Sequence, residues 1–378
     1  MGKAKEGSPR GICEVEGMNI VSIVGARPQF IKCAPVSKEM RKNNHEILVH
    51  TGQHYDYELS KVFFDQLGIP KPSYSLGVGS ASHGKQTGMM LLEIEKVLLK
   101  EKPDFVLVYG DTNSTLAGAL AAVKLHITIG HVESGLRSFD RTMPEEINRV
   151  LTDHASDLLF VPTKTAIKNL KNEGISKNVF LVGDVMYDVL KQNIAIAARS
   201  QILEILAIKP KDYLLATIHR PSNTDNLKNL SQILEAFSSV NKQIIFPVHP
   251  RTEHLIKKHG LQKKIGKNIK IMKSASYFDF LWLEKNANKI LTDSGGIQKE
   301  SYLLKVPCIT LRDNTEWVET IEDGWNILVG TSKEKIIHAI QNFNPNGKQR
   351  NLFGYGDAST KIVKIIEDYG SNKIIHHL

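Results

Sequence analysis

The sequence of 378 residues has few cysteines and lacks any long hydrophobic run. Its three cysteines, Cys13, Cys33 and Cys308, are widely separated and odd in number, so they match no zinc-ligand spacing and favour free thiols in a reducing cytosol. No apolar run approaches the ~20 residues of a membrane-spanning helix, so we expect a cytoplasmic protein without a membrane segment. The polar residues 1–17 contain no signal core and are predicted to form a disordered tail.

The sequence also lacks a basic tract interleaved with aromatic residues. Its net charge of +9 is moderate, and this charge alone does not distinguish an anionic substrate from a solvated basic surface or nucleic acid. Without such a tract, nucleic acid is the weaker candidate partner. The hydrophobic content of 41% and the charged content of 24% are typical of a globular protein, and the chain is long enough for two α/β domains.

Two nucleotide-binding motifs are missing as well. No Lys-Ser/Thr pair completes a Walker motif, and no glycine pattern matches the dinucleotide-binding fingerprint. These absences disfavour ATP and nicotinamide chemistry. We therefore expect neither a cofactor nor a metal ion.

What the sequence does contain is a repeated alternation of short β-branched runs with segments of helical spacing, which is typical of an α/β fold with parallel sheets. The runs are continuously apolar, as expected for strands that are covered on both faces. Strands are predicted in the first half at residues 19–25, 46–52, 104–109, 127–132, 157–161 and 179–182, and in the second half at residues 213–218, 244–248, 269–272, 289–292, 307–311 and 327–329.

The alternation stops between residues 183 and 206, where a long helix-like stretch predicts a linker between two domains. We therefore predict a first domain at residues 18–190, a second domain at residues 191–357 and a final helical segment at residues 358–378.

The most informative stretch, residues 130–149, carries acids and arginines directly after a predicted strand. Glu133 follows that strand, Glu145 and Glu146 lie at a predicted helix start, and Asp111 closes an upstream strand. Because the carboxyl ends of parallel strands line the ligand crevice of an α/β sheet, we interpret these acids as acid/base groups beside an anion site. The alternative is that they only cap helices or enrich first turns.

Candidate anion-binding residues follow three other strands. Arg27 lies in a turn where unpaired helix-start amides favour an anion, and Lys32 follows about one turn later. His219 ends a strand in the second half, where a histidine either donates charge to a leaving group or is structural. Residues 292–300 (TDSGGIQKE) place two glycines at a helix start, which either lets a diphosphate approach the backbone or forms an ordinary turn. Glu300, at the end of this stretch, is placed to accept hydrogen bonds from ribose hydroxyls.

Together, these motifs resemble the family of non-hydrolysing UDP-N-acetylglucosamine 2-epimerases. The matching stretches are residues 25–32 (GARPQFIK), 110–112 (GDT), 131–137 (HVESGLR), 144–149 (PEEINR), 219–220 (HR) and 292–300 (TDSGGIQKE). The resemblance implies two Rossmann-like domains of the glycosyltransferase-B type, with the active site in the cleft between them. It also implies that the last helix crosses back onto the first domain and that the protein is a homodimer.

The resemblance further implies roles for individual residues. The implied catalytic residues are three acid/base carboxylates and a histidine that assists departure and return of UDP, namely Asp111, Glu133, Glu145 and His219. The implied substrate-binding residues hold the diphosphate (Arg27, Ser294, Gly295 and Gly296), the ribose (Glu300), the uracil (Phe280) and the region of the sugar (Lys32 and Arg149).

The implied reaction interconverts UDP-GlcNAc and UDP-ManNAc. The hydrogen at C2 of an acetamido sugar has no adjacent carbonyl, so its direct removal is too costly. Anti elimination expels UDP from C1 while a carboxylate removes the C2 proton, which gives 2-acetamidoglucal; UDP adds back after reprotonation on the other face. The leaving diphosphate requires cationic and backbone donors.

The sequence departs from the family pattern at several positions. Ser222 replaces a glutamate that usually follows the His-Arg pair. Some members bind a second UDP-sugar as an activator; at the corresponding positions Gln53 and His249 are retained, but Asp56 and Met89 replace polar or basic residues. We therefore predict turnover without an activator.

Three alternative functions are compatible with part of these motifs. Residues 52–56 (GQHYD) and 315–317 (TEW) also resemble the branch that acts on UDP-2,3-diacetamido-2,3-dideoxyglucuronate, which is the alternative within the same enzyme class. A retaining glycosyltransferase of the same architecture would need an acceptor pocket and has no evident need for three acids. In a non-catalytic nucleotide-sugar binder, the acids would be dispensable.

Overall fold

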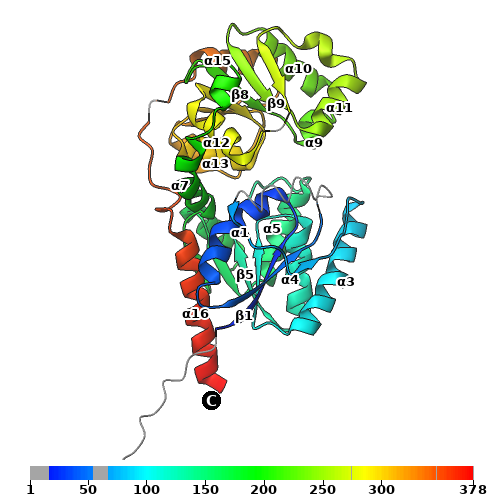
Figure 1. Ribbon diagram of the computed structural model, residues 1–378, viewed down its shortest axis with the longest axis vertical. Coiled ribbons are helices and arrows are strands. Elements are labelled where there is room, and N and C mark those ends of the chain that lie inside the picture. Colours follow the sequence, from blue (N-terminus) through cyan, green and yellow to red (C-terminus); the bar gives the residue numbers. More distant parts are fainter. Residues whose placement is uncertain (1–16, 54–66, 274, 346, 378) are drawn as a thin grey trace, which may run out of the picture.

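Two parallel sheets, each covered by helices on both faces, make up the computed structural model of the chain (Figure 1). The structure describes residues 17–53, 67–273, 275–345 and 347–377, without the side chains of Arg27 and residues 372–377. Nearly all of the predicted tail, Cys13 and Asp56 therefore lie outside the described residues. The seven-stranded sheet has the order β3-β2-β1-β4-β5-β6-β7, and the six-stranded sheet has the order β10-β9-β8-β11-β12-β13. These two Rossmann-like sheets confirm the predicted α/β fold.

The first sheet and its helices occupy the first half of the chain. Its elements are β1 (Asn19–Val24), α1 (Arg27–Met40), β2 (His45–His50), β3 (Tyr74–Ser75), α3 (His83–Glu101), β4 (Phe105–Tyr109), α4 (Asn113–Lys124), β5 (Thr128–Val132), α5 (Pro144–Ala155), β6 (Leu158–Val161), α6 (Lys164–Asn172), β7 (Val179–Leu181) and α7 (Val185–Ala197). All six predicted strands are observed, within two residues of the predicted ends. The two-residue strand β3 was not predicted, because it is too short to produce a pattern.

The second sheet repeats this organisation, and its six predicted strands are also observed. Its elements are α8 (Ile202–Ile205), β8 (Tyr213–Thr217), α9 (Pro221–Thr224), α10 (Leu227–Ser238), β9 (Gln243–Pro247), α11 (Pro250–Lys258), β10 (Ile269–Met272), α12 (Tyr277–Asn286), β11 (Lys289–Thr292), α13 (Gly295–Leu303), β12 (Cys308–Thr310), α14 (Val318–Glu322), β13 (Asn326–Leu328), α15 (Lys333–Asn342) and α16 (Ala358–His377).

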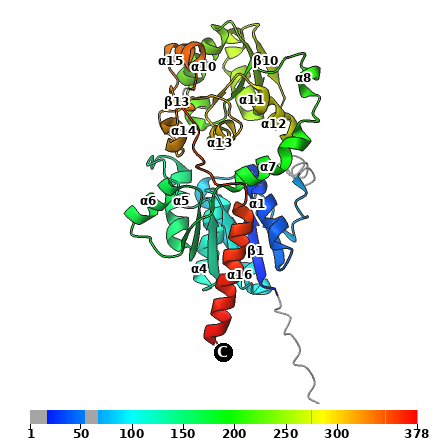
Figure 2. The same ribbon diagram turned by 90° about the vertical axis from the view of Figure 1, so that its left-hand side faces the viewer.

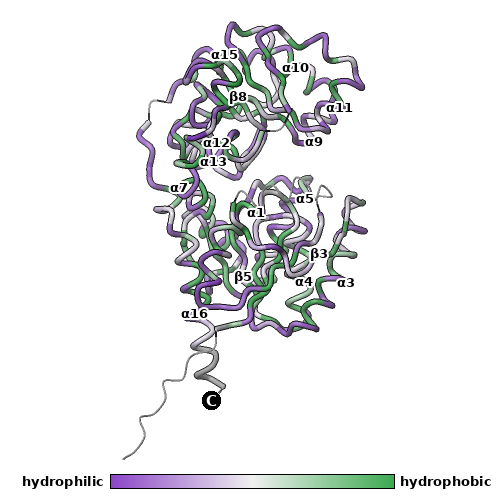
Figure 3. The backbone as a smooth tube through the Cα atoms, in the orientation of Figure 1, coloured by the Kyte–Doolittle hydropathy of each residue, from purple (hydrophilic) through white to green (hydrophobic). Residues whose placement is uncertain are grey.

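The strands are apolar throughout because alternate residues enter different cores. In β1, Ile20 and Val24 pack into the core that contains α1 and α16, whereas Val21 and Ile23 pack into the core that contains α3 and α4. A strand with both faces buried gains from an apolar residue at every position. Figure 3 shows the result, with apolar residues gathered on the strands and polar residues on the outer loops.

Helix α7 connects the two sheet-and-helix layers, and α16 returns to the first of them. α7 packs against α1 of the first layer and also against α12 of the second. α16 returns along the first layer, where it packs against α1 and α7 (Figure 2). Asp188 on α7 accepts hydrogen bonds from the Ala358 and Ser359 amides, at 3.1 and 2.7 Å, and so fixes the start of α16. The predicted domain division at residues 190 and 191 falls within α7 and stays a prediction. Among the described residues, no helix is both long and apolar enough to cross a membrane.

Each sheet contains one point where the strand order reverses, between β1 and β4 in the first sheet and between β8 and β11 in the second. Ligands of open α/β sheets bind outside the carboxyl ends of the strands at such points. The residues that follow these four strands include Arg27, Asp111, His219 and Ser294. The fold therefore brings predicted site residues to both reversal points.

Candidate active site

The turn between β1 and α1 is fixed by one buried glutamine. The Oε1 atom of Gln29 accepts a hydrogen bond from the Gly25 amide at 2.8 Å, while its Nε2 atom donates to the Tyr109 carbonyl at 3.0 Å and to the Thr115 hydroxyl at 2.9 Å. This links the carboxyl ends of β1 and β4 and sets the first turn of α1. Arg27 begins that helix, but its side chain lies outside the described part of the chain, so its role in binding stays a prediction.

Glu133 directly follows β5 in a left-handed backbone conformation, with φ at +71°. This conformation is strained for a residue other than glycine, and such strain is concentrated at functional sites. The Glu133 amide donates to the Phe160 carbonyl at 3.1 Å, which keeps the turn in place. Nearby, the buried His131 ring contacts the Asp153 carboxylate and the Gly110 carbonyl, each at 2.7 Å, and so ties β5 to the end of β4.

The Glu133 carboxylate contacts two buried lysines. Its Oε2 atom pairs with Lys32 on α1, and its Oε1 atom lies 2.6 Å from the ammonium nitrogen of Lys299 on α13. Burial alone would raise the pKa of Glu133, but the positive charges of Lys299 and Lys32 outweigh it and lower the pKa from 4.5 to about 2. Glu133 is therefore ionised at neutral pH.

Asp111 is held by an arginine that also contacts the second sheet. Arg149 on α5 lies 3.0 Å (Nε) and 2.6 Å (Nη2) from Asp111 Oδ2, and its Nη1 atom lies 3.0 Å from Glu146. Its Nη2 atom is also 3.8 Å from Glu316, which pairs in turn with Arg312 at 3.0 Å. Burial opposes the charge on Glu316, but Arg149 and Arg312 outweigh it and lower the pKa of Glu316 to about 2.

The two neighbouring glutamates of α5 have different functions. Glu146 is buried and accepts hydrogen bonds from the Ser138 and Phe139 amides, both at 2.9 Å, so it holds the loop before α5. Glu145 instead keeps 37% of its side chain exposed and makes a 3.3 Å ion pair with Arg220, which follows β8 in the second sheet. Glu146 therefore has a structural role, as the alternative to acid/base chemistry proposed for these acids.

That alternative is wrong for Asp111. The residue that caps α4 is Thr112, whose hydroxyl accepts a hydrogen bond from the Thr115 amide at 3.4 Å. The Asp111 carboxylate is directed to Arg149 instead and remains 24% exposed.

His219 is oriented by an aspartate that sequence reasoning left without a role. Asp293, which follows β11, lies 3.2 Å from the His219 Nδ1 atom and accepts hydrogen bonds from the His219 and Arg220 amides. Asn223 donates to the same carboxylate at 3.0 Å. Although burial opposes ionisation of Asp293, the His219 contacts lower its pKa. Because Nδ1 is engaged, Nε2 is the ring nitrogen left for a ligand.

The glycine-rich start of α13 is open on one side and tightly packed on the other. A Cβ atom on Gly295 would lie 2.1 Å from the Glu316 carboxylate, so only glycine fits there. A Cβ atom on Gly296 would meet nothing closer than 3.9 Å, which leaves this part of the helix start accessible. Ser294 is the N-cap residue and makes no side-chain capping bond. Amides at such a helix start favour an anion.

The positions of Glu300 and Phe280, the two remaining predicted residues, do not test their predicted roles. Glu300 is buried on α13, and Phe280 on α12 is half-buried against the core beneath the second sheet. Their assignment to ribose and uracil stays a prediction.

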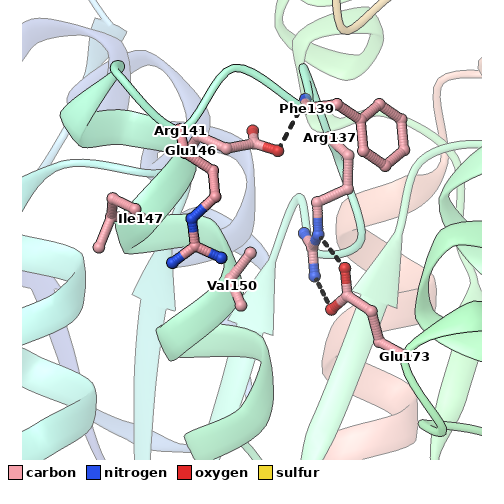
Figure 4. Close-up of a pocket in the computed structure, with 7 residues that line it drawn as sticks. All are labelled: Arg137, Phe139, Arg141, Glu146, Ile147, Val150 and Glu173. Carbon is pink, nitrogen blue, oxygen red and sulfur yellow. Dashed lines mark hydrogen bonds and ion pairs between the residues drawn. The ribbon is translucent and has the colours of Figure 1, made fainter.

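A pocket of about 170 Å³ lies beside this arrangement (Figure 4). Arg137 and Glu173 on its wall pair with each other through two contacts of 2.7 Å, and Glu146 is bonded to the Phe139 amide. Of the acids selected from the sequence only Glu146 lines it, and none of the catalytic or substrate-binding residues implied by the resemblance does, so we do not assign it to the substrate. Its lining residues are Arg137, Phe139, Arg141, Glu146, Ile147, Val150 and Glu173.

Sequence reasoning missed Lys299, Asp293 and Glu316 as parts of the site. All three lie within stretches that the motif analysis selected, residues 292–300 and 315–317, but no role was given to them. The missing information was the pairing, since each one contacts a residue that is more than 70 positions away in the chain.

The proposed activator positions are only partly described. Gln53 accepts hydrogen bonds from the Ser114 amide and hydroxyl, Met89 is 42% exposed on α3, and His249 caps α11. Asp56 lies outside the described residues, so the absence of an activator site stays a prediction. Among the described residues, no cluster of three or more histidine, cysteine, aspartate or glutamate side chains has the arrangement of a metal site.

Comparison with known proteins gives one consistent result. The model of the family described as UDP-N-acetylglucosamine 2-epimerase matches residues 38–367. A protein of Methanococcus maripaludis named UDP-N-acetylglucosamine 2-epimerase homolog is 60% identical over 93% of this chain and 100% of its own length. The UDP-2,3-diacetamido-2,3-dideoxy-D-glucuronate 2-epimerase of Pseudomonas aeruginosa is 46% identical over 92% of this chain and 99% of its own.

A solved structure is similar over nearly the same extent. The UDP-GlcNAc 2-epimerase of Methanocaldococcus jannaschii, crystallised with UDP-GlcNAc and UDP, is 51% identical and covers 93% of this chain and 99% of its own, with a TM-score of 0.88.

The depressed pKa values predict acid sensitivity. For Glu133 and Glu316, the folded-state pKa of about 2 lies below the ordinary 4.5, so the unfolded chain binds more protons. Their stabilisation is complete above about pH 4.5 and is lost as the pH falls toward 2. We expect the urea concentration at the midpoint of unfolding to fall over this range. In Glu316→Gln, the free energy of unfolding should change less steeply with pH, by at most ~1.4 kcal/mol per pH unit. The control Glu253→Gln, at an exposed position on α11, should keep the wild-type dependence of unfolding free energy on pH. If Glu316→Gln also kept it, the lowered pKa of Glu316 would be contradicted.

Proposed function

The chain belongs to the UDP-N-acetylglucosamine 2-epimerase family, and from this we propose that it is an isomerase that interconverts UDP-GlcNAc and UDP-ManNAc without hydrolysis. The M. jannaschii relative, 51% identical, was crystallised with UDP-GlcNAc and UDP, which supports this substrate. The observation that carries the proposal is the pairing of Asp111, Glu133 and Glu145 with cations where the two sheets meet. We propose anti elimination of UDP and its re-addition through 2-acetamidoglucal.

The three carboxylates are the acid/base groups of this proposal and lie in different environments. Glu133 is ionised beside Lys32 and Lys299, so it is able to accept a proton. Its negative charge would also stabilise the positive charge that develops at C1 as UDP departs. Asp111 and Glu145 keep 24% and 37% of their side chains exposed, so both are accessible for proton transfer at C2.

The second sheet would bind the leaving group. The amides at the start of α13, around Ser294 and Gly296, would accept the diphosphate, and the open space at Gly296 supports a close approach. His219, oriented through Nδ1 by Asp293, would present Nε2 to the phosphate oxygen that leaves and returns. In this account Arg27, Glu300 and Phe280 complete the UDP site, with Lys32 and Arg149 near the sugar.

One specific observation supports a second candidate substrate. The P. aeruginosa relative, 46% identical over nearly the whole chain, is named for UDP-2,3-diacetamido-2,3-dideoxy-D-glucuronate. The M. maripaludis and M. jannaschii proteins are more similar and are named for UDP-N-acetylglucosamine, which favours the first candidate.

The assembly and location belong to the same proposal. We expect a cytoplasmic homodimer that supplies a precursor for polysaccharide synthesis. The exposed apolar residues Met89, Leu92 and Leu99 of α3 support the dimer, because their spacing of three and seven residues places them on one face of the helix.

The reaction is tested by incubating the protein with UDP-GlcNAc in heavy water. We expect UDP-ManNAc with deuterium at C2, because elimination exposes the removed proton to solvent. Proton NMR of the separated sugars measures the exchange. Turnover with complete retention of protium would contradict elimination and reprotonation from solvent. Turnover of the diacetamido-uronate but not of UDP-GlcNAc would replace the proposed substrate.

The acid/base assignment predicts large losses from isosteric changes. Asp111→Asn and Glu145→Gln should each lower kcat by roughly 10²–10⁴-fold, the usual contribution of a positioned acid or base, with little change in fold. Asp104→Asn at the opposite end of β4 is the matched control and should leave kcat unchanged, since Asp104 is exposed and its side chain accepts a hydrogen bond from the Asn19 amide, away from the site. Near-normal kcat in either site variant would remove that residue from the assignment.

The dimer is tested by sedimentation. We expect the wild-type chain to sediment as a dimer, and Leu92→Asp to shift it toward the monomer because a charge would be buried at the interface. Lys257→Ala, which changes an exposed residue of α11 outside α3, serves as the control. A monomeric wild-type protein would refute the proposal.

A further inference from the structure

Lys299 is a fully buried charge that the proposed reaction leaves without a role. It lies on α13 of the second layer, and 1% of its side chain is exposed. Its ammonium nitrogen lies 2.6 Å from Glu133 Oε1 and 2.5 Å from Asp184 Oδ2, and both of these carboxylates belong to elements of the first half of the chain. The ammonium also lies 4.2 Å from the centre of the Trp317 ring.

The partners of Lys299 hold it in one position. Asp184 is itself fixed, because it caps α7 by accepting a hydrogen bond from the Met186 amide at 2.8 Å. The Trp317 face adds a cation–π contact, which is stronger when water is excluded. Burial would lower the pKa of Lys299, but Asp184 and Glu133 outweigh this and raise it. The ammonium is thus charged, immobile and directed at Glu133.

The two lysines at Glu133 differ in their origin. Lys32 lies on α1, which packs on the sheet that also carries Glu133, so this pair forms within the first half of the structure. Lys299 comes from α13, the helix whose start carries Ser294, Gly295 and Gly296. Lys299 lies three positions after Gly296 on this helix, which is a rise of about 4.5 Å. A displacement of the diphosphate-binding helix relative to β5 would therefore move Lys299 away from Glu133.

We propose that Lys299 is a positioning residue that sets the geometry and charge of Glu133 and couples them to the seating of the nucleotide-binding helix against the first sheet. The inference rests on the proposed function, in which Glu133 acts on the sugar. Lys299 contributes the contact from the second half of the structure that keeps the Glu133 carboxylate in place. The charged groups that face Glu133 are Lys32 from α1 and Lys299 from α13, with Asp184 from α7 behind Lys299.

The test compares Lys299→Met and Lys299→Arg in the full-length chain. Met removes the charge with little change in volume, so the pKa of Glu133 should rise and its negative charge should be lost at a higher pH. In the wild type, a pKa of about 2 places Glu133 below the acid limb of the kcat–pH profile, so other groups set that limb. In Lys299→Met we expect Glu133, buried beside Lys32 alone, to become the group that sets the limb and to move it upward by about one unit or more. We also expect kcat at pH 7 to fall about 10-fold, with KM for UDP-GlcNAc within about threefold of wild type. Arg retains the charge and should restore the acid limb.

Lys289→Met is the matched control. Lys289 is also a buried lysine of the second sheet, but it donates to the Ala339 and Ile340 carbonyls at the end of α15. Its removal should reduce stability and leave the acid limb unchanged. If Lys299→Met does not fold, Lys299→Gln, which keeps a hydrogen-bond donor without the charge, should give the same shift of the limb.

Two outcomes separate this inference from the proposed function. Normal wild-type turnover together with an unshifted acid limb in the neutral Lys299 variants would overturn the inference alone, because the lysine would then be structural. A wild-type protein without turnover of either UDP-sugar would overturn the proposed function and this inference together.

Discussion

The site depends on one electrostatic constraint: carboxylates that are buried where the sheets meet require positive charges close by. Glu133 obtains one from Lys299 on the second sheet, at 2.6 Å, and Glu145 obtains one from Arg220 at 3.3 Å. Asp111 is connected to the second sheet through Arg149, which lies 3.8 Å from Glu316. Because Glu133, Glu145 and Asp111 are each linked to the second half of the structure, the last through Arg149, the complete charge arrangement requires that the two sheets lie together.

The two halves of the structure contribute different groups to the site. The first sheet supplies the acids, at strand ends tied together by buried polar residues such as Gln29 and His131. The second sheet supplies a helix start suited to a diphosphate and a histidine fixed by Asp293. A reaction that expels UDP from a sugar and returns it needs both sets of groups at once. Lys299 and Arg149 connect them.

The sequence predicted the strands well because both faces of most strands are buried, which makes runs such as residues 105–109 (FVLVY) continuously apolar. It also located the acids, since strand ends converge in a parallel sheet. The residue pattern alone could not distinguish Glu145 from Glu146, and only the family resemblance selected Glu145, because adjacent acids in a helix start look alike until the loop that Glu146 holds is seen. Lys299 was missed for a similar reason: its partners lie 115 or more positions away, and local patterns carry no information on such pairs.

Measuring the protonation of Glu133 itself tests the charge arrangement of the site most directly. In protein labelled with ¹³C at the glutamate carboxyl carbon, the Glu133 signal can be assigned by its loss in Glu133→Gln and followed as the pH is lowered. We expect no titration of this signal between pH 8 and pH 4, because Lys299 and Lys32 hold the pKa at about 2. Titration of Glu133 within that range would contradict the charge arrangement on which the proposed site is built.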